Sequence, residues 1–326
     1  MKKVLIAILL LGLLPHASAD YIHWVDFRLS APVLRSALEL DMASQGGEQP
    51  LDWIDILALA AAWRGGTGVT VADTHRAAQV LRGDTPPERL PGMAGRYFSY
   101  YRAAYGAALG GLVGHFAIRR TDPQTGEAEW IPAYGLKAFS PIAAGYPWSH
   151  YPDFGAQRSY GYARPHLGND ILGALGTPIC AVEGGTVEAL GWNRYGGWRI
   201  GIRSDDRKRY YYYAHLRKDT PYAEGLSVGQ RVQAGDVIGF MGRTGYSAQE
   251  NVNNIETVHL HFGLQLIFDE SQKECDSEIW IDVYPIIELL ASHCSSVARD
   301  PQTGRWERLY PYCDLDAEPL RSAAAR

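Results

Sequence analysis

The sequence predicts an α+β protein in which a small helical domain precedes a domain built mainly from antiparallel β-strands. Between residues 30 and 109, apolar residues recur at helical spacing, and two of the runs end at glycine pairs. From residue 115 onward, short β-prone segments separated by glycines replace that pattern, which is typical of antiparallel sheets. A chain of 326 residues is long enough for two such domains.

Four helices are expected in the N-terminal part. Ser30 can cap the first, which ends before a pair of glycines, and Asp52 can cap the second, which ends before Gly65. Apolar periodicity places two more helices over residues 74–81 and 94–109. This part of the chain contains no metal-binding or nucleophile motif, so we expect a module that positions or regulates its neighbour.

A lysozyme-like glycosidase is the alternative for the helical domain. Such an enzyme needs an acidic residue in a cleft, and Glu39, Glu48 and Glu88 are available. Surface and capping roles explain all three glutamates, so the regulatory interpretation is preferred.

The second domain is predicted to be a sheet of short strands. Its expected strands are rich in β-branched and aromatic residues, lie between glycines, and cover residues 179–182, 186–191, 198–203, 209–216, 231–233, 237–241 and 258–266. A hairpin over 115–119 and 128–132 precedes them, and a helix over 282–291 follows them.

The N-terminus has the three parts of a secretory signal peptide. Two lysines precede an uncharged apolar run over residues 4–14, and Ala17-Ser18-Ala19 precedes Asp20. The apolar run is shorter than the roughly twenty residues that span a bilayer, although an uncleaved anchor is the alternative. We therefore expect secretion to the periplasm or cell wall, with no stable membrane insertion after cleavage.

Charge and cysteine usage narrow the function further. The formal net charge is −5 and no Lys/Arg run is present, which argues against a nucleic-acid partner. The four cysteines, Cys180, Cys275, Cys294 and Cys313, form no CxxC pair, so a structural thiolate zinc site is not expected. Export permits disulfides, and a bridge among the last three cysteines stays open, whereas Cys180 is expected to be a small buried residue.

Four of the ten histidines fall in an ordered set of motifs. His166 and Asp170 offer an imidazole and a carboxylate, which are ligands that catalytic zinc prefers. His259 and His261 lie on one face of a predicted strand because side chains alternate with period two. His215 ends a tyrosine-rich run, and the same alternation places it on one face with residues 211 and 213. Each histidine alone is more often an ordinary hydrogen-bonded residue; the ordered set favours a metal site.

The complete pattern resembles a known enzyme family. HxxxD, then Tyr-x-His-Leu, a glycine-rich strand pair and His-Leu-His-Phe-Gly are similar to the lysostaphin- and LytM-type zinc endopeptidases of peptidase family M23, over residues 160–290. The resemblance implies a LytM-like, barrel-sandwich-like antiparallel sheet with an open groove. It also implies that His166, Asp170 and His261 hold one Zn²⁺ per chain and leave a fourth position for water.

The same resemblance implies roles for other residues. His215 and His259 correspond to the two histidines that assist catalysis, and Tyr160 to a tyrosine directed at the developing oxyanion, with Tyr162 and Tyr213 as competitors for that place. Three side chains are candidates for contacts with substrate, although turn chemistry explains the first two equally well: Asn193, Tyr195 and Tyr213.

These inferences divide the chain into five parts: a signal peptide (1–19), a helical domain (20–112), a hairpin and linker (113–152), a peptidase domain (153–294) and a C-terminal tail (295–326). The expected function is that of a secreted zinc endopeptidase that hydrolyses peptide bonds in bacterial cell-wall peptidoglycan. The alternative is a non-catalytic protein of the same fold that binds the wall or regulates other proteins there. An insertion over 246–258 departs from the family pattern, so the bond cleaved is not transferred.

Overall fold

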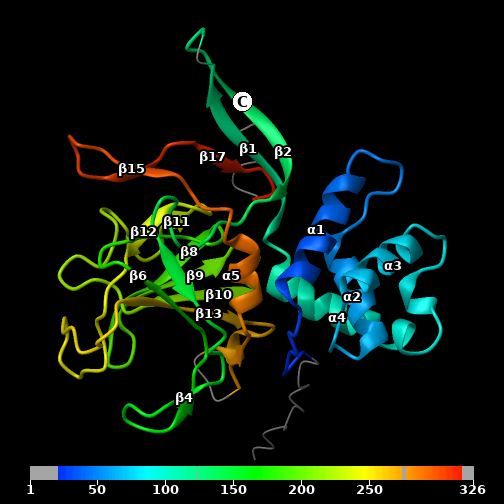
Figure 1. Cartoon of the computed structure of the whole chain (residues 1–326), viewed down its shortest axis with the longest axis horizontal. Helices are drawn as coiled ribbons and strands as arrows, with labels where there is room; N and C mark the ends of the chain where they lie inside the picture. The colour runs from blue at the N-terminus through cyan, green and yellow to red at the C-terminus, as the bar shows by residue number, and fades with distance from the viewer. Residues whose placement is uncertain (1–20, 123, 274–276, 318–326) are drawn as a thin grey trace, which may run out of the picture.

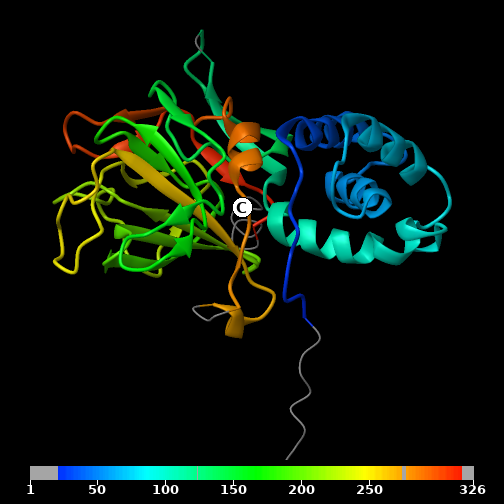
Figure 2. The same cartoon turned by 60° about the horizontal axis from the view of Figure 1, so that its bottom comes forward.

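The computed structural model describes residues 21–122, 124–273 and 277–317. The expected signal peptide and Cys275 lie outside these residues. In Figures 1 and 2 a group of helices lies beside a larger β-rich body, and a two-stranded hairpin projects from the region between them. Across the described ranges, no helix combines the length and the apolar composition needed to cross a bilayer.

The four predicted N-terminal helices are confirmed. They are α1 (Ala31–Ser44), α2 (Trp53–Arg64), α3 (Val71–Leu81) and α4 (Met93–Leu109), with a short 3₁₀ helix, η1 (Pro87–Arg89), before the last. Asp52 caps α2 by accepting a hydrogen bond from the Ile54 amide at 2.7 Å, whereas the Ser30 side chain makes no capping hydrogen bond. Helix α3 begins earlier than predicted because Thr70 and Asp73 form a reciprocal capping box.

Helix α2 forms the centre of the helical domain. It contacts α1, α3 and α4, and nine of its twelve residues are buried. A helix that is apolar on nearly all sides is stable in water only when neighbours surround it. The three other helices therefore form a layer around α2.

The β-rich body contains an antiparallel sheet of eight strands, which confirms the predicted α+β class. Their order is β11-β8-β9-β10-β13-β6-β3, and β14 pairs with β13. Their bounds are β3 (Trp148–His150), β6 (Asn169–Gly173), β8 (Gly185–Asn193), β9 (Gly197–Ser204), β10 (Arg209–Ala214), β11 (Arg231–Val232), β13 (His259–Leu266) and β14 (Ile279–Trp280). Strand β3, within the segment expected to be a linker, pairs with β6 and so belongs to this sheet.

Smaller elements surround this sheet. Two pairs of short strands are β4 (Gln157–Arg158) with β5 (Arg164–Pro165) and β7 (Pro178–Cys180) with β12 (Val237–Phe240). The predicted C-terminal helix appears as α5 (Tyr284–Leu290), which contacts α1, and a 3₁₀ helix, η2 (Glu270–Gln272), precedes it. The helix α5 therefore connects the two domains.

The projecting hairpin pairs with a strand from the C-terminal segment. Strands β1 (Val113–Thr121) and β2 (Ala128–Leu136) form the predicted hairpin, and β17 (Tyr312–Asp314) pairs with β1. Between α5 and β17 lies a second hairpin, β15 (Val297–Arg299) with β16 (Trp306–Arg308). Part of the C-terminal segment is thus a strand of the sheet that contains β1 and β2. Cys313, within this strand, and Cys294 are free thiols.

The two faces of the central sheet have different roles. Tyr211, Tyr213 and Phe262 project from β10 and β13 into the hydrophobic core, where each is at most 2% exposed. Residues 212 and 261 alternate with them and therefore project from the opposite face. That opposite face carries the candidate site.

Gly197 is required where β9 begins. Its φ is +65°, and a Cβ atom there would lie 2.4 Å from the carbonyl carbon of Thr244 and 2.5 Å from the Gly245 nitrogen. Both contacts are with backbone, which cannot rotate away. We expect Gly197→Ala to lower the free energy of unfolding by about 1–3 kcal/mol more than Gly225→Ala does, measured by urea titration. Gly225 is the matched control because its φ is +82° but no atom would lie within 4 Å of a Cβ added there; equal losses in the two variants would contradict this steric account.

Candidate metal centre

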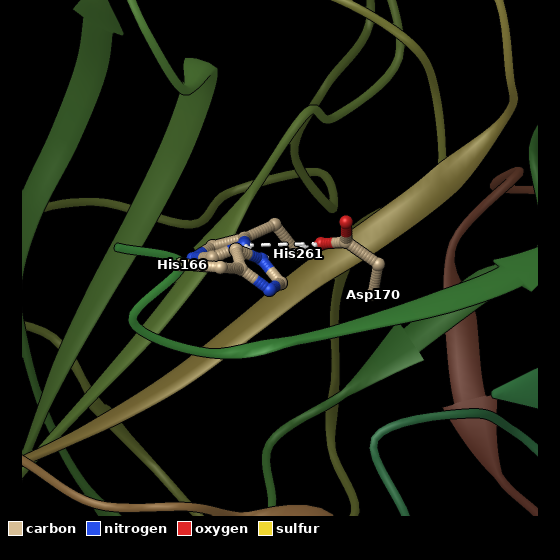
Figure 3. Close-up of side chains that lie close together, drawn as sticks. All are labelled: His166, Asp170 and His261. Atoms are coloured by element: carbon tan, nitrogen blue, oxygen red, sulfur yellow. Dashed lines mark hydrogen bonds and ion pairs between the residues drawn. The ribbon is translucent and has the colours of Figure 1, made fainter. Parts of the chain in front are cut away.

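Three side chains from two neighbouring strands and the loop before one of them meet at a single point. His166 lies in the turn between β5 and β6, Asp170 on β6, and His261 on β13 directly opposite Asp170 in the antiparallel register. His166 Nε2 lies 2.8 Å from His261 Nδ1 and 3.0 Å from Asp170 Oδ1, and His261 Nδ1 lies 3.1 Å from Asp170 Oδ1. Figure 3 shows the three side chains directed toward one another.

This donor set suits zinc. Two imidazole nitrogens and one carboxylate oxygen are typical ligands of catalytic zinc, which keeps a further position open. The atoms form a triangle with edges near 3 Å, close enough for all three to bind one ion with bonds of about 2.0–2.2 Å. The three residues are a group that can hold a metal ion, and their chemistry fits zinc.

Second contacts hold these ligands in place. His166 Nδ1 lies 3.1 Å from the carbonyl oxygen of Asp153 and 3.2 Å from its carboxylate, so the outer nitrogen faces a hydrogen-bond acceptor. Arg158 Nη2 donates to Asp153 at 3.0 Å and to Asp170 Oδ2 at 2.9 Å. Asn169 Nδ2 donates to the other oxygen of Asp153 at 2.9 Å. Such contacts fix the tautomer and orientation of a metal-binding imidazole.

The electrostatics reflect how tightly the cluster is packed. Burial disfavours the charged form of His166, but hydrogen bonds and charge from Asp153 and Asp170 outweigh it and raise the pKa of His166 to about 9. Burial also opposes the ionised form of Asp170, yet the hydrogen bonds to His166 and His261 hold its pKa far below the ordinary value. Burial lowers the pKa of His261. Asp170 is therefore ionised at neutral pH.

His215 and His259 lie beside the cluster. Their ring centroids are 4.7 Å apart, and the His215 ring is 5.9 Å from that of His261. His215 Nδ1 contacts the Thr244 carbonyl and His259 Nδ1 the Thr257 carbonyl, each at 2.9 Å. Because a carbonyl oxygen can only accept, each Nδ1 carries a proton and each Nε2 is the basic nitrogen.

The position of His215 corrects the strand alternation expected from the sequence. Tyr211 and Tyr213 lie in the core, and continued alternation would have placed His215 there with them. Strand β10 ends at Ala214, and His215 has a φ of +62°, which turns its side chain toward the metal cluster. Burial, followed by the nearby His259 and His261, lowers the pKa of His215 well below its usual value.

The other predicted residues lie in different places. The Tyr213 side chain is buried in the core, and its hydroxyl accepts a hydrogen bond from the Val182 amide at 3.0 Å. The expectation that Tyr213 contacts substrate is therefore corrected. Asn193 Oδ1 accepts from the amides of Tyr195 and Gly196, so it stabilises a turn. The Tyr195 ring lines the cleft.

Tyr160 lies beside the cleft. Its ring stacks on that of Tyr246, with centroids 4.5 Å apart and planes at 12°. Tyr246 itself lines the cleft, and its ring centroid is 5.9 Å from that of His215. Tyr162 is 57% exposed. Tyr246 belongs to the insertion that departs from the family pattern, so no motif in the sequence indicated it.

Two further residues of the site were also missed. Asp153 and Arg158 hold His166 and Asp170, but neither belongs to a recognisable motif. Their proximity depends on the β4–β5 pairing, and those two-residue strands leave almost no pattern in a sequence. The cleft at the metal cluster has a volume of about 170 Å³, and Arg158 and Tyr246 line it together with His166, Asp170, His215 and His261.

Comparisons with known proteins agree with this geometry. Residues 164–274 match the sequence description of Peptidase family M23. The chain is 35% identical over 177 residues to an L-Ala--D-Glu endopeptidase of Bacillus subtilis (strain 168), across 51% of this chain and 52% of the relative. It is 37% identical over 98 residues to lysostaphin of Staphylococcus simulans, across 30% of this chain and 17% of the relative. The chain thus spans about half or less of the curated relatives it matches.

A solved structure is also similar to part of the chain. The catalytic domain of the antimicrobial peptidase lysostaphin from Staphylococcus simulans aligns with a TM-score of 0.33 at 28% identity, covering 44% of this chain and 92% of that one. The segment that matches the family contains His166, Asp170, His215, His259 and His261. The chain carries a domain of peptidase family M23.

Proposed function

We propose that this protein is a zinc-dependent endopeptidase that hydrolyses peptide bonds in bacterial cell-wall peptidoglycan. The observation that carries the proposal is the convergence of His166, Asp170 and His261 within 2.8–3.1 Å, beside two histidines that each present a basic Nε2. The relatives named as endopeptidases support the reaction class. The wall substrate is inferred from the resemblance to the lysostaphin group.

In this proposal the ligands are His166 Nε2, Asp170 Oδ1 and His261 Nδ1. A zinc ion bound there would make a water molecule more acidic and would polarise the carbonyl group of the scissile bond. Asp153 holds the outer nitrogen of His166, and Arg158 holds the second oxygen of Asp170, so both ligands keep their orientation. These two residues act through the ligands.

In this proposal the two histidines that are not ligands take part in proton transfer. His215 is neutral at neutral pH because burial lowers its pKa, so its Nε2 accepts a hydrogen bond or a proton from the attacking water. The proton that His215 takes up can return to the departing amine, and His259, whose ring lies against that of His215, offers a second basic Nε2 that can accept a hydrogen bond from the water. Tyr160 remains a candidate for contact with the developing oxyanion, and Tyr195 for contact with the peptide. Action outside the cytoplasm follows from the expected signal peptide.

Analysis of the products tests this function. Purified sacculi incubated with the zinc-loaded protein should gain free amino groups, and mass spectrometry of the released muropeptides should identify the bond that was cut. New reducing ends would instead indicate a glycosidase. A zinc-loaded protein that binds sacculi without releasing products would favour the non-catalytic alternative.

Zinc uptake should depend on pH through His166. In the metal-free protein the pKa of His166 is raised to about 9, so its imidazole is protonated at pH 7 and must lose that proton to bind a metal. We expect the apparent zinc affinity to rise about tenfold per pH unit between pH 6.5 and 8.5 and to level off above about 9. Calorimetry in two buffers of different ionisation enthalpy should show about one proton released at pH 7. Proton release of zero, with a flat affinity, would contradict the raised pKa.

A further inference from the structure

A second pocket adjoins the metal centre on the same face of the sheet. It has a volume of about 220 Å³, and Leu167, Tyr212 and His261 line both it and the cleft. We call it the Arg199 pocket, after the arginine that lines it. Because the two hollows share three residues, the Arg199 pocket is directly next to the space in which a peptide would lie at the metal cluster.

The register of three strands explains why the pocket is there. Tyr212 on β10 lies between Gly201 on β9 and Gly263 on β13. Arg199 and His261 are each two residues from one of these glycines and so project from the same face. A Cβ on Gly263 would lie 2.8 Å from the Trp280 ring, which forms another wall of the pocket. The absence of a side chain at Gly263 therefore leaves space for the Trp280 ring.

Arg199 is the charged group of the lining that has no partner among the described residues. Lys273 pairs with Glu188, and Glu278 accepts a hydrogen bond from the neutral Trp280 indole at 2.7 Å, which orients its carboxylate without cancelling its charge. The Arg199 side chain forms no ion pair or hydrogen bond with any described residue, and its Nε is buried without a partner. Its two terminal nitrogens are not among the buried unpartnered atoms, so they are accessible to solvent, and Arg199 is one of the residues that line the pocket.

We propose that the Arg199 pocket is a specificity subsite that binds a carboxylate carried by the peptide substrate next to the scissile bond. The inference rests on the proposed endopeptidase function and adds the chemical class of the substrate. A guanidinium group pairs with a carboxylate through two parallel hydrogen bonds, which a carboxamide cannot reproduce. The pocket is smaller than the roughly 300 Å³ at which sites for whole small molecules begin, so it takes one side chain or one carboxyl-bearing branch.

The test compares substrates that differ in charge alone. Sacculi are used either untreated or with their free carboxylates converted to carboxamides. The wild-type protein should release products from untreated sacculi about tenfold faster or more, as expected for the loss of a hydrogen bond to a charged group. Arg199→Gln should cleave both substrates at the same slow rate, mainly through a higher KM, with zinc content unchanged. Arg199→Lys should retain part of the preference because it keeps the charge but loses the fork.

Arg35→Gln is the matched control, because this exposed arginine on α1 carries the same charge at a place away from the sheet. It should keep the wild-type preference. The proposal is overturned if Arg199→Gln retains the preference, or if Arg35→Gln loses it to the same extent, since net charge would then explain the effect. If the wild-type protein cleaves neither substrate, the endopeptidase function itself fails. If it cleaves both equally, the function stands and the subsite alone is rejected.

Discussion

Replacing His215 with alanine should leave the zinc content at the wild-type level and lower the rate of hydrolysis by about 10²–10⁴-fold. His215 is not one of the three clustered ligand residues, and its Nδ1 is engaged by the Thr244 carbonyl, so the metal site keeps all its donors. What the substitution removes is the basic Nε2 beside the cluster. Metal analysis and product release from sacculi, measured on the same sample, separate the two effects.

The control for this variant is His115→Ala. His115 is an exposed histidine on β1 whose Nδ1 lies 3.3 Å from Asp316, so its loss should change neither zinc content nor rate. If His215→Ala loses zinc together with activity, then His215 supports the metal site and has no separate role in proton transfer. A rate within twofold of the wild type would contradict any catalytic role.

Arg209→Ala should lower the free energy of unfolding by about 3–5 kcal/mol. Arg209 is 1% exposed and pairs with Glu183 through Nε at 2.7 Å and Nη2 at 3.0 Å. Its Nη1 also donates to the Ala107 carbonyl at 2.7 Å, near the end of α4, so it joins the helical domain to the sheet. Removing it leaves the carboxylate of Glu183 buried with the Tyr211 hydroxyl as its remaining donor. Urea denaturation gives the change.

Two companion variants make the result specific. Arg207→Ala removes a 62% exposed arginine two positions away, which pairs with Glu270 at 3.0 Å, and should cost at most about 1 kcal/mol. The double variant Arg209→Met/Glu183→Leu removes both buried charges and should recover a large part of the loss. If Arg209→Ala costs no more than Arg207→Ala, the buried pair does not hold the domains together.

The metal-binding residues could be predicted from the sequence because their motifs are local and strand geometry fixes the spacing of the side chains on one face. His259 and His261 alternate along one strand, and HxxxD places His166 and Asp170 within one short segment. By contrast, Tyr213 was misplaced because tyrosine is common both in cores and in grooves, and only the register of β10 distinguishes the two. His215 departs from the alternation because its φ is positive, and the sequence does not indicate a positive φ at a residue other than glycine.

The supporting residues could not be predicted for a different reason. Asp153 and Arg158 reach the site beside the pairing of β4 and β5, which are two residues long. Arg199 lies on a strand that was predicted, but it belongs to no recognisable motif. Part of the C-terminal segment was expected to be a tail because β17 has three residues, and its partner β1 lies almost two hundred positions earlier. Short strands with distant partners show too little local pattern to be recognised in a sequence. The helices were recognised because they are longer, and some begin at capping residues.

Zinc titration with simultaneous product analysis tests the central claim most directly. Protein stripped by a chelator should release no muropeptides from purified sacculi, and hydrolysis should rise with added zinc and reach a plateau at about one equivalent per chain. His166→Ala, assayed in parallel, should neither retain zinc nor regain hydrolysis at that stoichiometry. Full hydrolysis by the stripped protein, or by His166→Ala without zinc, would contradict the account.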